Sequence, residues 1–435
     1  MQISRVLRPA RRSITLAVQV AFLARSQWWS GEKIRNWQNA RLTTMLRHAV
    51  SRVPYYAELG IEPAGMAGAD ALKRFPLLTK DIIQQQGDRL RDPALDPSSL
   101  HASKTSGSSG QPTTTYFDGN AWLLCKYALK IRRTLLGGPP LGQRLMIFGE
   151  QSTDGGTEPK VHRRLTHREM RLSVFLPLDA QHASFVAYRP TMVYGAPSAL
   201  KALCDHARER NLPLPPVRTV FLSSELITGA VRRQLELDLA CRVIGVYGST
   251  EFKEVAWECD ENRYHINFES VYLENLPPEH ATGEPRLLIT TLVNRAMPLI
   301  RFDIGDYARI GTGPCACGRQ SPWLSELAGR RAEYLELADG RRISPYLLTT
   351  SIENVAGLRQ YQIVQHTGHA LELRVIFLPT HRERATSRAE LEQTLKRLVG
   401  PETPVRVSEV DVIARTPAGK HQIVMRADQG LADHS

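Results

Sequence analysis

The segment between residues 141 and 247 alternates short apolar runs with longer mixed stretches, and this alternation constrains the fold more than any other feature. Helical spacing marks the longer stretches Ser198–Arg210 and Gly229–Leu239. The apolar runs have the length of buried strands and cover residues 141–148, 191–194, 217–222 and 242–247. Strands that alternate with helices predict an α/β fold with an at least partly parallel sheet.

After about residue 264 the sequence becomes rich in strand-forming residues and turns. The expected strands there are Arg286–Leu292, Tyr307–Ile310 and Glu333–Leu337. The last hundred residues predict strands at Gln360–Gln365, Leu371–Phe377 and Val405–Val412 and a helix at Ser387–Leu398. We therefore expect a large N-terminal α/β domain over residues 1–332, helical over 1–53, and a small α+β C-terminal domain over 333–435. The boundary is expected near Gly329–Asp339.

Charge and cysteine content narrow the classes of function. The chain has 56 Lys and Arg against 44 Asp and Glu, a formal net charge of +12, which suits anionic small molecules, acidic carrier proteins, nucleic acid or a membrane surface. No element interleaves basic with aromatic residues, so we expect no nucleic-acid partner. No apolar stretch approaches the roughly 18–20 residues of a spanning helix. Six cysteines in 435 residues are too few for a disulfide scaffold.

The N-terminus imitates a secretory signal. Arg5, Arg8, Arg11 and Arg12 precede an apolar stretch from Ile14 to Ala24, but no small-residue cleavage site follows it. An amphipathic helix that lies on the protein body or on a membrane face is the better interpretation. We therefore expect a cytoplasmic protein, with peripheral membrane contact of the N-terminus as an open alternative.

A loop of hydroxyls and glycines between Lys104 and Thr113 is the densest chemical signal. Backbone N–H groups and short hydroxyl donors packed in this way suit phosphate oxygens. The loop differs from the P-loop pattern because no lysine follows Gly110, and a flexible surface loop is the alternative. The candidate phosphate ligands are Thr105, Ser106, Gly107, Ser108, Ser109 and Gly110.

Four further motifs follow this loop: YGSTE at Tyr247–Glu251, RFDIGD at Arg301–Asp306, GR at Gly329–Arg330 and TPAGK at Thr416–Lys420. Each is weak alone, but their order and spacing resemble the adenylate-forming ligase superfamily. The chain is most similar to the phenylacetate–CoA ligase and CapK branch, from about Trp28 to Val424. Further segments of the resemblance are RVPYYAELG, FPLLTKDI, YGAPSAL, FLSSELI, MPLIRFDIGD and CACGR.

The resemblance implies a phosphate site and a catalytic lysine. Thr105–Gly110 would hold the β- and γ-phosphates of ATP, and Glu251 would hold the Mg²⁺ that bridges them. Thr250 would contact the α-phosphate, and Lys420 on the small domain would reach the carboxylate and α-phosphate during adenylation. The family's small domain swings between its two half-reactions, and the hinge would fall near Ala332–Glu333.

The same resemblance implies a site for adenosine. Tyr247, followed by Gly248 and Ser249, would stack on adenine. Asp306 would accept both ribose hydroxyls, with Arg330 near the ribose and phosphate. The residues implied to line the adenine side are Ser223, Ser224 and Glu225.

Each implied role has a structural alternative. Asp306 follows a glycine and could simply cap a turn. Glu251 could lie beside a helix N-terminus, and Lys420 could be one of the solvated lysines common near chain ends.

Three cysteines and one histidine form a candidate structural zinc site. The set is Cys259, His265, Cys315 and Cys317. One imidazole and three thiolates suit a closed tetrahedral site, and some members of the phenylacetate ligase branch carry a matching set. Reduced thiols packed in a core are the alternative.

The carboxylate that is activated should be selected by residues around the ends of the expected strands. The candidates are Phe148, Tyr194, Gly195, Ala196, Pro197 and Val246. The basic segment Gly149–Arg168 could cover the substrate, or receive CoA or an acidic carrier protein, or be a solvated charged loop.

The predicted function is ATP-dependent adenylation of an aryl or acyl carboxylic acid to acyl-AMP, with pyrophosphate release and transfer to a thiol. CoA is the default acceptor, and the phosphopantetheine of an acyl carrier protein is the runner-up. An amine or hydroxyl acceptor stays open. The rival from another class is a non-catalytic, nucleotide-binding relative that acts as an assembly partner.

Overall fold

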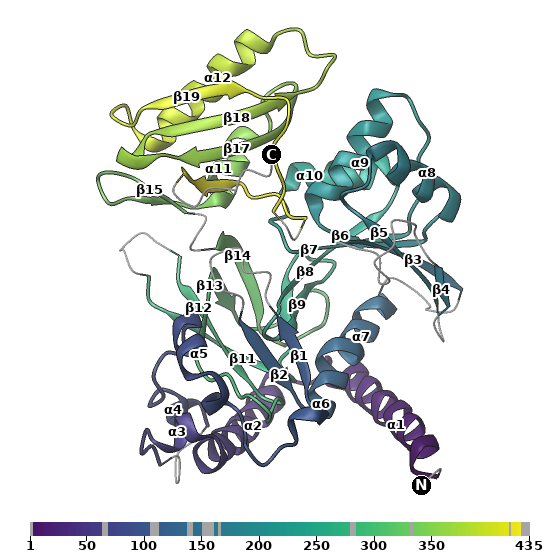
Figure 1. Cartoon of the computed structure of the whole chain (residues 1–435), viewed down its shortest axis with the longest axis vertical. Helices are drawn as coiled ribbons and strands as arrows, with labels where there is room; N and C mark the ends of the chain where they lie inside the picture. Colours follow the sequence, from purple (N-terminus) through teal and green to yellow (C-terminus); the bar gives the residue numbers. More distant parts are fainter. Residues whose placement is uncertain are drawn as a thin grey trace. The chain divides into compact units, whose positions relative to one another are not determined.

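The structure is a computed structural model that describes residues 3–62, 68–104, 113–136, 142–149, 161–163, 167–278, 284–330, 334–416 and 419–427. The chain forms two compact units, each built from two segments. Unit 1 comprises Met1–Pro140 and Gly245–Glu326, and unit 2 comprises Leu141–Ile244 and Leu327–Ser435. Figure 1 labels most of the helices and strands of both units. The predicted boundary at residues 332 and 333 and the hinge at Ala332–Glu333 lie outside the described residues.

Helices and turns make up the N-terminal part of unit 1. Its long helices are α1 (Ile3–Ser26) and α2 (Gly31–Arg52), followed by the short α3 (Pro54–Ala57), α4 (Gly68–Leu72) and α5 (Lys80–Gln86). The 3₁₀ turns η1 (Gly87–Leu90) and η2 (Pro97–Ser99) lead into β1 (His101–Lys104) and β2 (Thr114–Phe117). Then come α6 (Gly119–Trp122), the π-helical η3 (Leu123–Ala128) and α7 (Leu129–Leu136).

Local sequence signals explain where these helices begin. Ser30 caps α2 by accepting a hydrogen bond from the Lys33 N–H, and Thr79 caps α5 by accepting one from the Ile82 N–H. The α1 helix is formed as predicted. It buries Leu23 in a cluster with η3 and α7, while Ile14 and Val18 stay exposed. In the described part of the chain, no helix is both long and apolar enough to cross a membrane.

An antiparallel sheet follows in unit 1. Its strands are β8 (Arg242–Ser249), β9 (Lys253–Glu258), β10 (Tyr264–Ile266), β11 (Val271–Leu276), β12 (Arg286–Thr291), β13 (Phe302–Gly311) and β14 (Trp323–Arg330). They lie in the order β11-β12-β13-β14-β10-β9-β8. The ladders β8–β9, β9–β10, β10–β14, β11–β12 and β12–β13 are antiparallel. These strands confirm the prediction that the chain is rich in β-structure after about residue 264.

The first segment of unit 2 has the predicted alternation of strands and helices. Its strands are β3 (Gln143–Gly149), β4 (Val161–Arg163), β5 (His167–Ser173), β6 (Met192–Gly195) and β7 (Thr219–Ser223). The ladders β3–β5, β3–β6 and β6–β7 are parallel, and β4 pairs antiparallel with β5. The helices α8 (Leu178–Tyr188), α9 (Pro197–Glu209) and α10 (Gly229–Asp238) lie together on one face of these strands (Figure 1). Phe185 and Leu200 are fully buried in their core.

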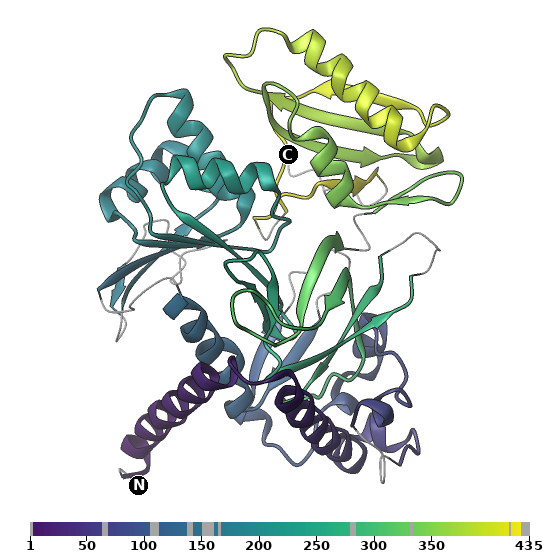
Figure 2. The same ribbon diagram turned by 180° about the vertical axis from the view of Figure 1, so that it is seen from behind.

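The C-terminal segment of unit 2 is the predicted α+β structure. It comprises β15 (Leu335–Glu336), β16 (Arg342–Ile343), α11 (Pro345–Ile352), β17 (Leu358–Gln365), η5 (Thr367–His369), β18 (Leu371–Phe377), α12 (Arg384–Val399), β19 (Val405–Glu409) and β20 (Val424–Arg426). Four strands form a sheet in the order β19-β18-β17-β20. The helices α11 and α12 cover one face of this sheet (Figure 2), and Leu348, Leu373 and Leu391 are fully buried there.

Candidate active site

The YGSTE motif forms the end of β8 and the turn into β9 in unit 1. The Tyr247 hydroxyl donates a hydrogen bond to Asp306 Oδ2 at 2.7 Å, so the structure brings together two predicted residues that are 59 positions apart. Asp306 lies in β13 and is 9% exposed. A carboxylate can accept hydrogen bonds from the ribose hydroxyls of a nucleoside, and an adjacent aromatic ring offers a face on which its base can stack.

The glycine of this motif is required by close packing. A Cβ on Gly248 would lie 2.3 Å from the carbonyl oxygen of Lys253, which is closer than real Cβ contacts. The β8–β9 ladder shifts register between Tyr247 and Gly248, and the Ser249 hydroxyl closes the turn by accepting from the Phe252 N–H at 3.2 Å. Glu251 lies buried in this turn, where its carboxylate is the hard oxygen ligand that Mg²⁺ prefers.

Lys253 is a residue that the sequence analysis missed. Its ammonium donates a hydrogen bond to the Ser103 hydroxyl, which in turn donates to the carbonyl oxygen of Thr250 at 3.1 Å. Burial, followed by the charge of Lys126, lowers the Lys253 pKa to about 8. Because Ser103 lies in β1, this chain of contacts ties the Thr250 turn to the strand that precedes the glycine-serine loop. The predicted loop ligands Thr105–Gly110 lie outside the described residues.

The described residues of the TPAGK motif, Thr416, Gly419 and Lys420, lie in unit 2 and are joined by backbone and side-chain hydrogen bonds. The Thr416 N–H donates to the Lys420 carbonyl oxygen at 2.9 Å, and the Lys420 N–H donates to Thr416 Oγ1 at 3.2 Å. Gly419 has a φ of 71°, and a Cβ there would lie 2.5 Å from Val174 Cγ2. Glycine is therefore required both by the left-handed backbone and by the packing against Val174.

The predicted adenine-side residues Ser223–Glu225 follow β7 in unit 2. Ser223 is buried, and Ser224 has a φ of 76°. The carboxylate of Glu225 accepts hydrogen bonds from the Ser198 N–H at 2.9 Å, from the Ser198 hydroxyl at 2.9 Å and from the His421 N–H at 2.7 Å. Glu225 thus contacts the residue that follows Lys420, a contact that the sequence analysis did not predict.

The remaining predicted residues are distributed over both units. Tyr194 and Gly195 end β6, Ala196 and Pro197 begin α9, and a Cβ on Gly195 would lie 3.0 Å from the Phe148 Cβ. These five residues belong to unit 2. The buried Val246 belongs to unit 1. Arg330 ends β14, and its side chain is outside the described part of the structure.

The structure brings the four predicted zinc ligands together in unit 1. The ligand atoms of Cys259, His265, Cys315 and Cys317 all lie within 4.8 Å of one another. The sulfurs of Cys259 and Cys315 are 3.8 Å apart, and Cys317 Sγ lies 3.3 Å from His265 Nε2. Zn–S bonds of about 2.3 Å place the sulfurs of a tetrahedral site about 3.8 Å apart. The donor set therefore fits zinc.

Neighbouring groups orient this Cys/His cluster. The Ser321 hydroxyl lies 2.9 Å from His265 Nδ1, which leaves Nε2 directed at the cysteines. Burial, together with the charge of Arg319, lowers the His265 pKa to about 4, so the ring is neutral as a metal ligand must be. Arg319 donates to Cys317 Sγ at 3.5 Å, and its guanidinium lies 4.6 Å from the Trp257 ring centre.

The curated proteins that are similar to this chain include phenylacetate-coenzyme A ligases and a CapK protein. No family model matches the chain. Phenylacetate-coenzyme A ligase of Escherichia coli is 26% identical over 422 residues, which cover 89% of this chain and 93% of that protein. The enzyme of the same name from Thermus thermophilus is 27% identical over 337 residues, 70% of this chain and 72% of that protein. Protein CapK of Staphylococcus aureus is 20% identical over 408 residues, 89% of this chain and 88% of that protein.

Solved structures support the fold. A 2-hydroxyisobutyryl-CoA ligase in complex with 2-HIB-AMP superposes with a TM-score of 0.77 at 20% identity, over 93% of this chain and 91% of that chain. A benzoate CoA ligase from Burkholderia xenovorans gives a TM-score of 0.51 at 16% identity, over 88% of this chain and 81% of that chain. In sequence this chain is similar to phenylacetate-coenzyme A ligases and to CapK, and it shares the fold of the solved CoA ligases.

Proposed function

We propose that this protein is an AMP-forming acid–thiol ligase that activates a carboxylic acid with ATP and transfers the acyl group to CoA. The observation that carries the proposal is the 2.7 Å hydrogen bond between Tyr247 and Asp306. These two residues come from separate motifs, and the resemblance assigns them to adenine and to ribose. The relatives named phenylacetate-coenzyme A ligase, which match over most of the chain, support the same reaction class.

The reaction has two steps. In the first, a carboxylate oxygen attacks the α-phosphorus of ATP, forming the mixed anhydride acyl-AMP while the bond to pyrophosphate breaks. In the second, a thiolate attacks the acyl carbonyl, forming a thioester while AMP leaves. The first step brings negative charge onto negative charge, so it needs cations and fixed donors around the phosphoryl oxygens.

The residues proposed to supply these groups are Thr250, Glu251 and Lys420. Thr250 would donate to the α-phosphate, and its position is supported by the contact with Ser103. The buried carboxylate of Glu251 would hold Mg²⁺, which would offset phosphate charge. Lys420 would bring a positive charge to the carboxylate and the α-phosphate, and its backbone N–H donates to Thr416 Oγ1.

The test is ATP–pyrophosphate exchange on the purified protein with a panel of aryl, fatty and amino acids. We expect exchange with one class of acid, which would also name the substrate class. Thioester formation with CoA, compared with a phosphopantetheinyl carrier protein and with amine or hydroxyl acceptors, then identifies the acceptor. Nucleotide binding with no exchange for any acid would contradict the proposal and favour the non-catalytic relative.

We propose in addition that the Cys/His cluster holds a structural zinc ion. All four ligands belong to one site without a described carboxylate among them, which suits a closed structural centre rather than a catalytic one. Metal analysis should find about one zinc per chain, and Cys317→Ser should lose it and unfold at a lower temperature. Cys204→Ser, which changes a buried cysteine of unit 2, is the control and should keep the zinc. A metal-free wild-type protein of equal stability would refute the assignment.

A further inference from the structure

A half-buried carboxylate in unit 2 joins three segments that are far apart in the sequence. Glu225 follows β7, Ser198 lies in the first turn of α9, and His421 follows Lys420. Glu225 Oε1 accepts from the Ser198 hydroxyl and from the His421 N–H, and Oε2 accepts from the Ser198 N–H. We call residues 419–421 the Lys420 loop.

The guanidinium of Arg415 also contacts Ser198 and the backbone next to Lys420. Arg415 Nη1 donates to the Ser198 hydroxyl at 2.7 Å and to the Gly419 carbonyl oxygen at 3.0 Å. Arg415 Nη2 donates to the Ser198 carbonyl oxygen at 3.3 Å. Ser198 is therefore contacted by both charged groups, while the backbone on each side of Lys420 is held, at Gly419 by Arg415 and at His421 by Glu225.

The local structure makes this carboxylate useful at the start of α9. Ala196 is the N-cap of α9 and offers no side-chain acceptor, so the Ser198 N–H needs an acceptor from elsewhere. Glu225 provides it and also places a carboxylate at the positive end of the helix. Burial raises the pKa of Glu225, and the hydrogen bonds from the His421 and Ser198 N–H groups act in the opposite direction.

We propose that Glu225, Ser198 and Arg415 are positioning residues that hold the Lys420 loop in the geometry needed for adenylation. This inference rests on the proposed function and deepens it. The contacts reach the backbone on either side of Lys420, and we assign them to the first half-reaction. Thioester formation does not use Lys420 under this proposal. Loss of the set therefore slows acyl-adenylate formation and spares the transfer of a preformed acyl-adenylate to CoA.

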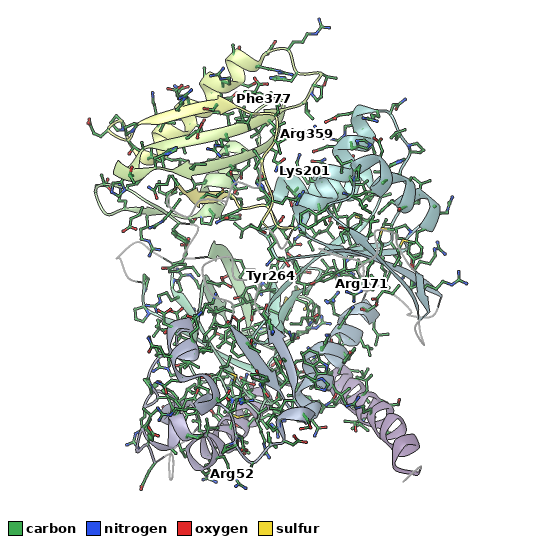
Figure 3. The ribbon with its side chains drawn as sticks, in the orientation of Figure 1. Arg52, Arg171, Lys201, Tyr264, Arg359 and Phe377 are labelled. Carbon is green, nitrogen blue, oxygen red and sulfur yellow. The ribbon has the colours of Figure 1, made fainter. Side chains whose placement is uncertain are left out.

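Other contacts between α9 and the C-terminal segment offer a matched control. Lys201 Nζ donates to the Arg359 carbonyl oxygen at 3.0 Å, and Arg359 Nε lies 3.4 Å from Glu209 Oε1. Lys201 and Arg359 are labelled in Figure 3, where they lie next to each other. The substitution Glu209→Gln changes a carboxylate that connects the same two segments and has no described contact with the Lys420 loop.

The experiment compares both half-reactions in Glu225→Gln and Glu209→Gln. We expect Glu225→Gln to lower the kcat of ATP–pyrophosphate exchange about tenfold or more, with the KM for ATP changed less than about twofold. Thioester formation from a supplied acyl-adenylate and CoA should stay within about twofold of wild type. Glu209→Gln should leave both half-reactions unchanged. Equal losses in both half-reactions for Glu225→Gln, or no loss in exchange, would overturn the inference.

A readout without turnover separates this inference from the proposed function. The His421 amide should lose protection from hydrogen exchange in Glu225→Gln and keep it in Glu209→Gln. If the wild-type protein catalyses no exchange but the His421 amide loses protection in Glu225→Gln, the proposed reaction is refuted, whereas the role of Glu225 in holding the Lys420 loop is supported. Unchanged protection of His421 would refute the inference in an active or an inactive enzyme. If Glu225→Gln does not fold, Ser198→Ala removes the shared hydroxyl and should show the same pattern.

Discussion

Each unit holds a glutamate in a network of polar contacts, Glu269 buried in unit 1 and Glu225 half-buried in unit 2, and the two carboxylates are held in different ways. Glu269 in unit 1 pairs directly with the Arg132 guanidinium at 2.8 Å, and Arg132 also donates to Asn267. Glu225 in unit 2 is held by two N–H groups and one hydroxyl, and the nearby Arg415 donates to Ser198 and Gly419. The first arrangement consists of side chains that neutralise each other within a core. The second consists largely of contacts to backbone around a functional loop.

This difference teaches how each contact relates to function. Removing a guanidinium from a buried ion pair leaves an uncompensated charge, so the Arg132–Glu269 pair must stay intact whenever unit 1 is folded. The Glu225 contacts can be lost without stranding a partner of opposite charge, because an N–H group or a hydroxyl can bond water instead. Unit 1 thus contains a charge pair that is costly to break, whereas the Lys420 loop of unit 2 is held by contacts that can be exchanged for water.

The largest expected effect is on the stability of unit 1. Arg132→Met should lower the free energy of unfolding by roughly 3–5 kcal/mol, because the carboxylate of Glu269 stays buried without its partner. Arg89→Met, which removes an exposed partner of Glu58, is the control and should cost less than about 1 kcal/mol. Urea unfolding measures both. A loss for Arg132→Met as small as that of the control would remove the contrast between the units.

The next effect concerns chemistry. Lys420→Ala should lower acyl-adenylate formation by roughly 10²–10³-fold, because a positive charge at the α-phosphate is lost in the transition state. ATP affinity should change by less than about threefold, since the proposed adenosine contacts of Tyr247 and Asp306 are intact. Single-turnover adenylation and ATP titration measure the two quantities. Unchanged adenylation would refute the role of Lys420.

The smallest effect is the pH dependence of the Lys420 loop. Burial, followed by the charge of Arg415, lowers the His421 pKa to about 4, and its ring contacts Gln360 and Tyr361. As the pH falls, His421 therefore takes up a proton near pH 6.5 in the unfolded chain but only near pH 4 in the folded chain. The resulting stability is present above pH 6.5, is lost as the pH falls toward 4, and amounts to at most roughly 3 kcal/mol.

The substitution His421→Gln removes this titration while keeping a polar side chain next to Gln360. The free energy of unfolding, measured between pH 7 and pH 4.5, should fall less steeply in the variant than in wild type. Because every other titrating group is common to both proteins, the difference between the two curves belongs to His421. Parallel curves would show that His421 is not held neutral by burial.

Much of the fold was predictable because its signals are local. Thr79 caps α5 with its own side chain, so the start of that helix is determined by neighbouring residues in the sequence. The alternation of apolar runs and helical spacing predicted β3, β6, β7 and β8 in nearly their observed places. Tyr247 and Asp306, and the Cys/His cluster, were predicted from motif and resemblance, and the structure then brought each set together.

The sequence by itself determined the class of the sheets, the positions of the main helices and the identity of the motif residues, because strand length, helical spacing and capping act between near neighbours. Only the tertiary structure decided which distant groups serve those motifs. Lys253 reaches Ser103 across 150 positions, and Glu225 reaches His421 across 196. The sequence around a serine, a lysine or a glutamate does not indicate its partner, since the partner is determined by the packing of elements that lie far apart in the chain.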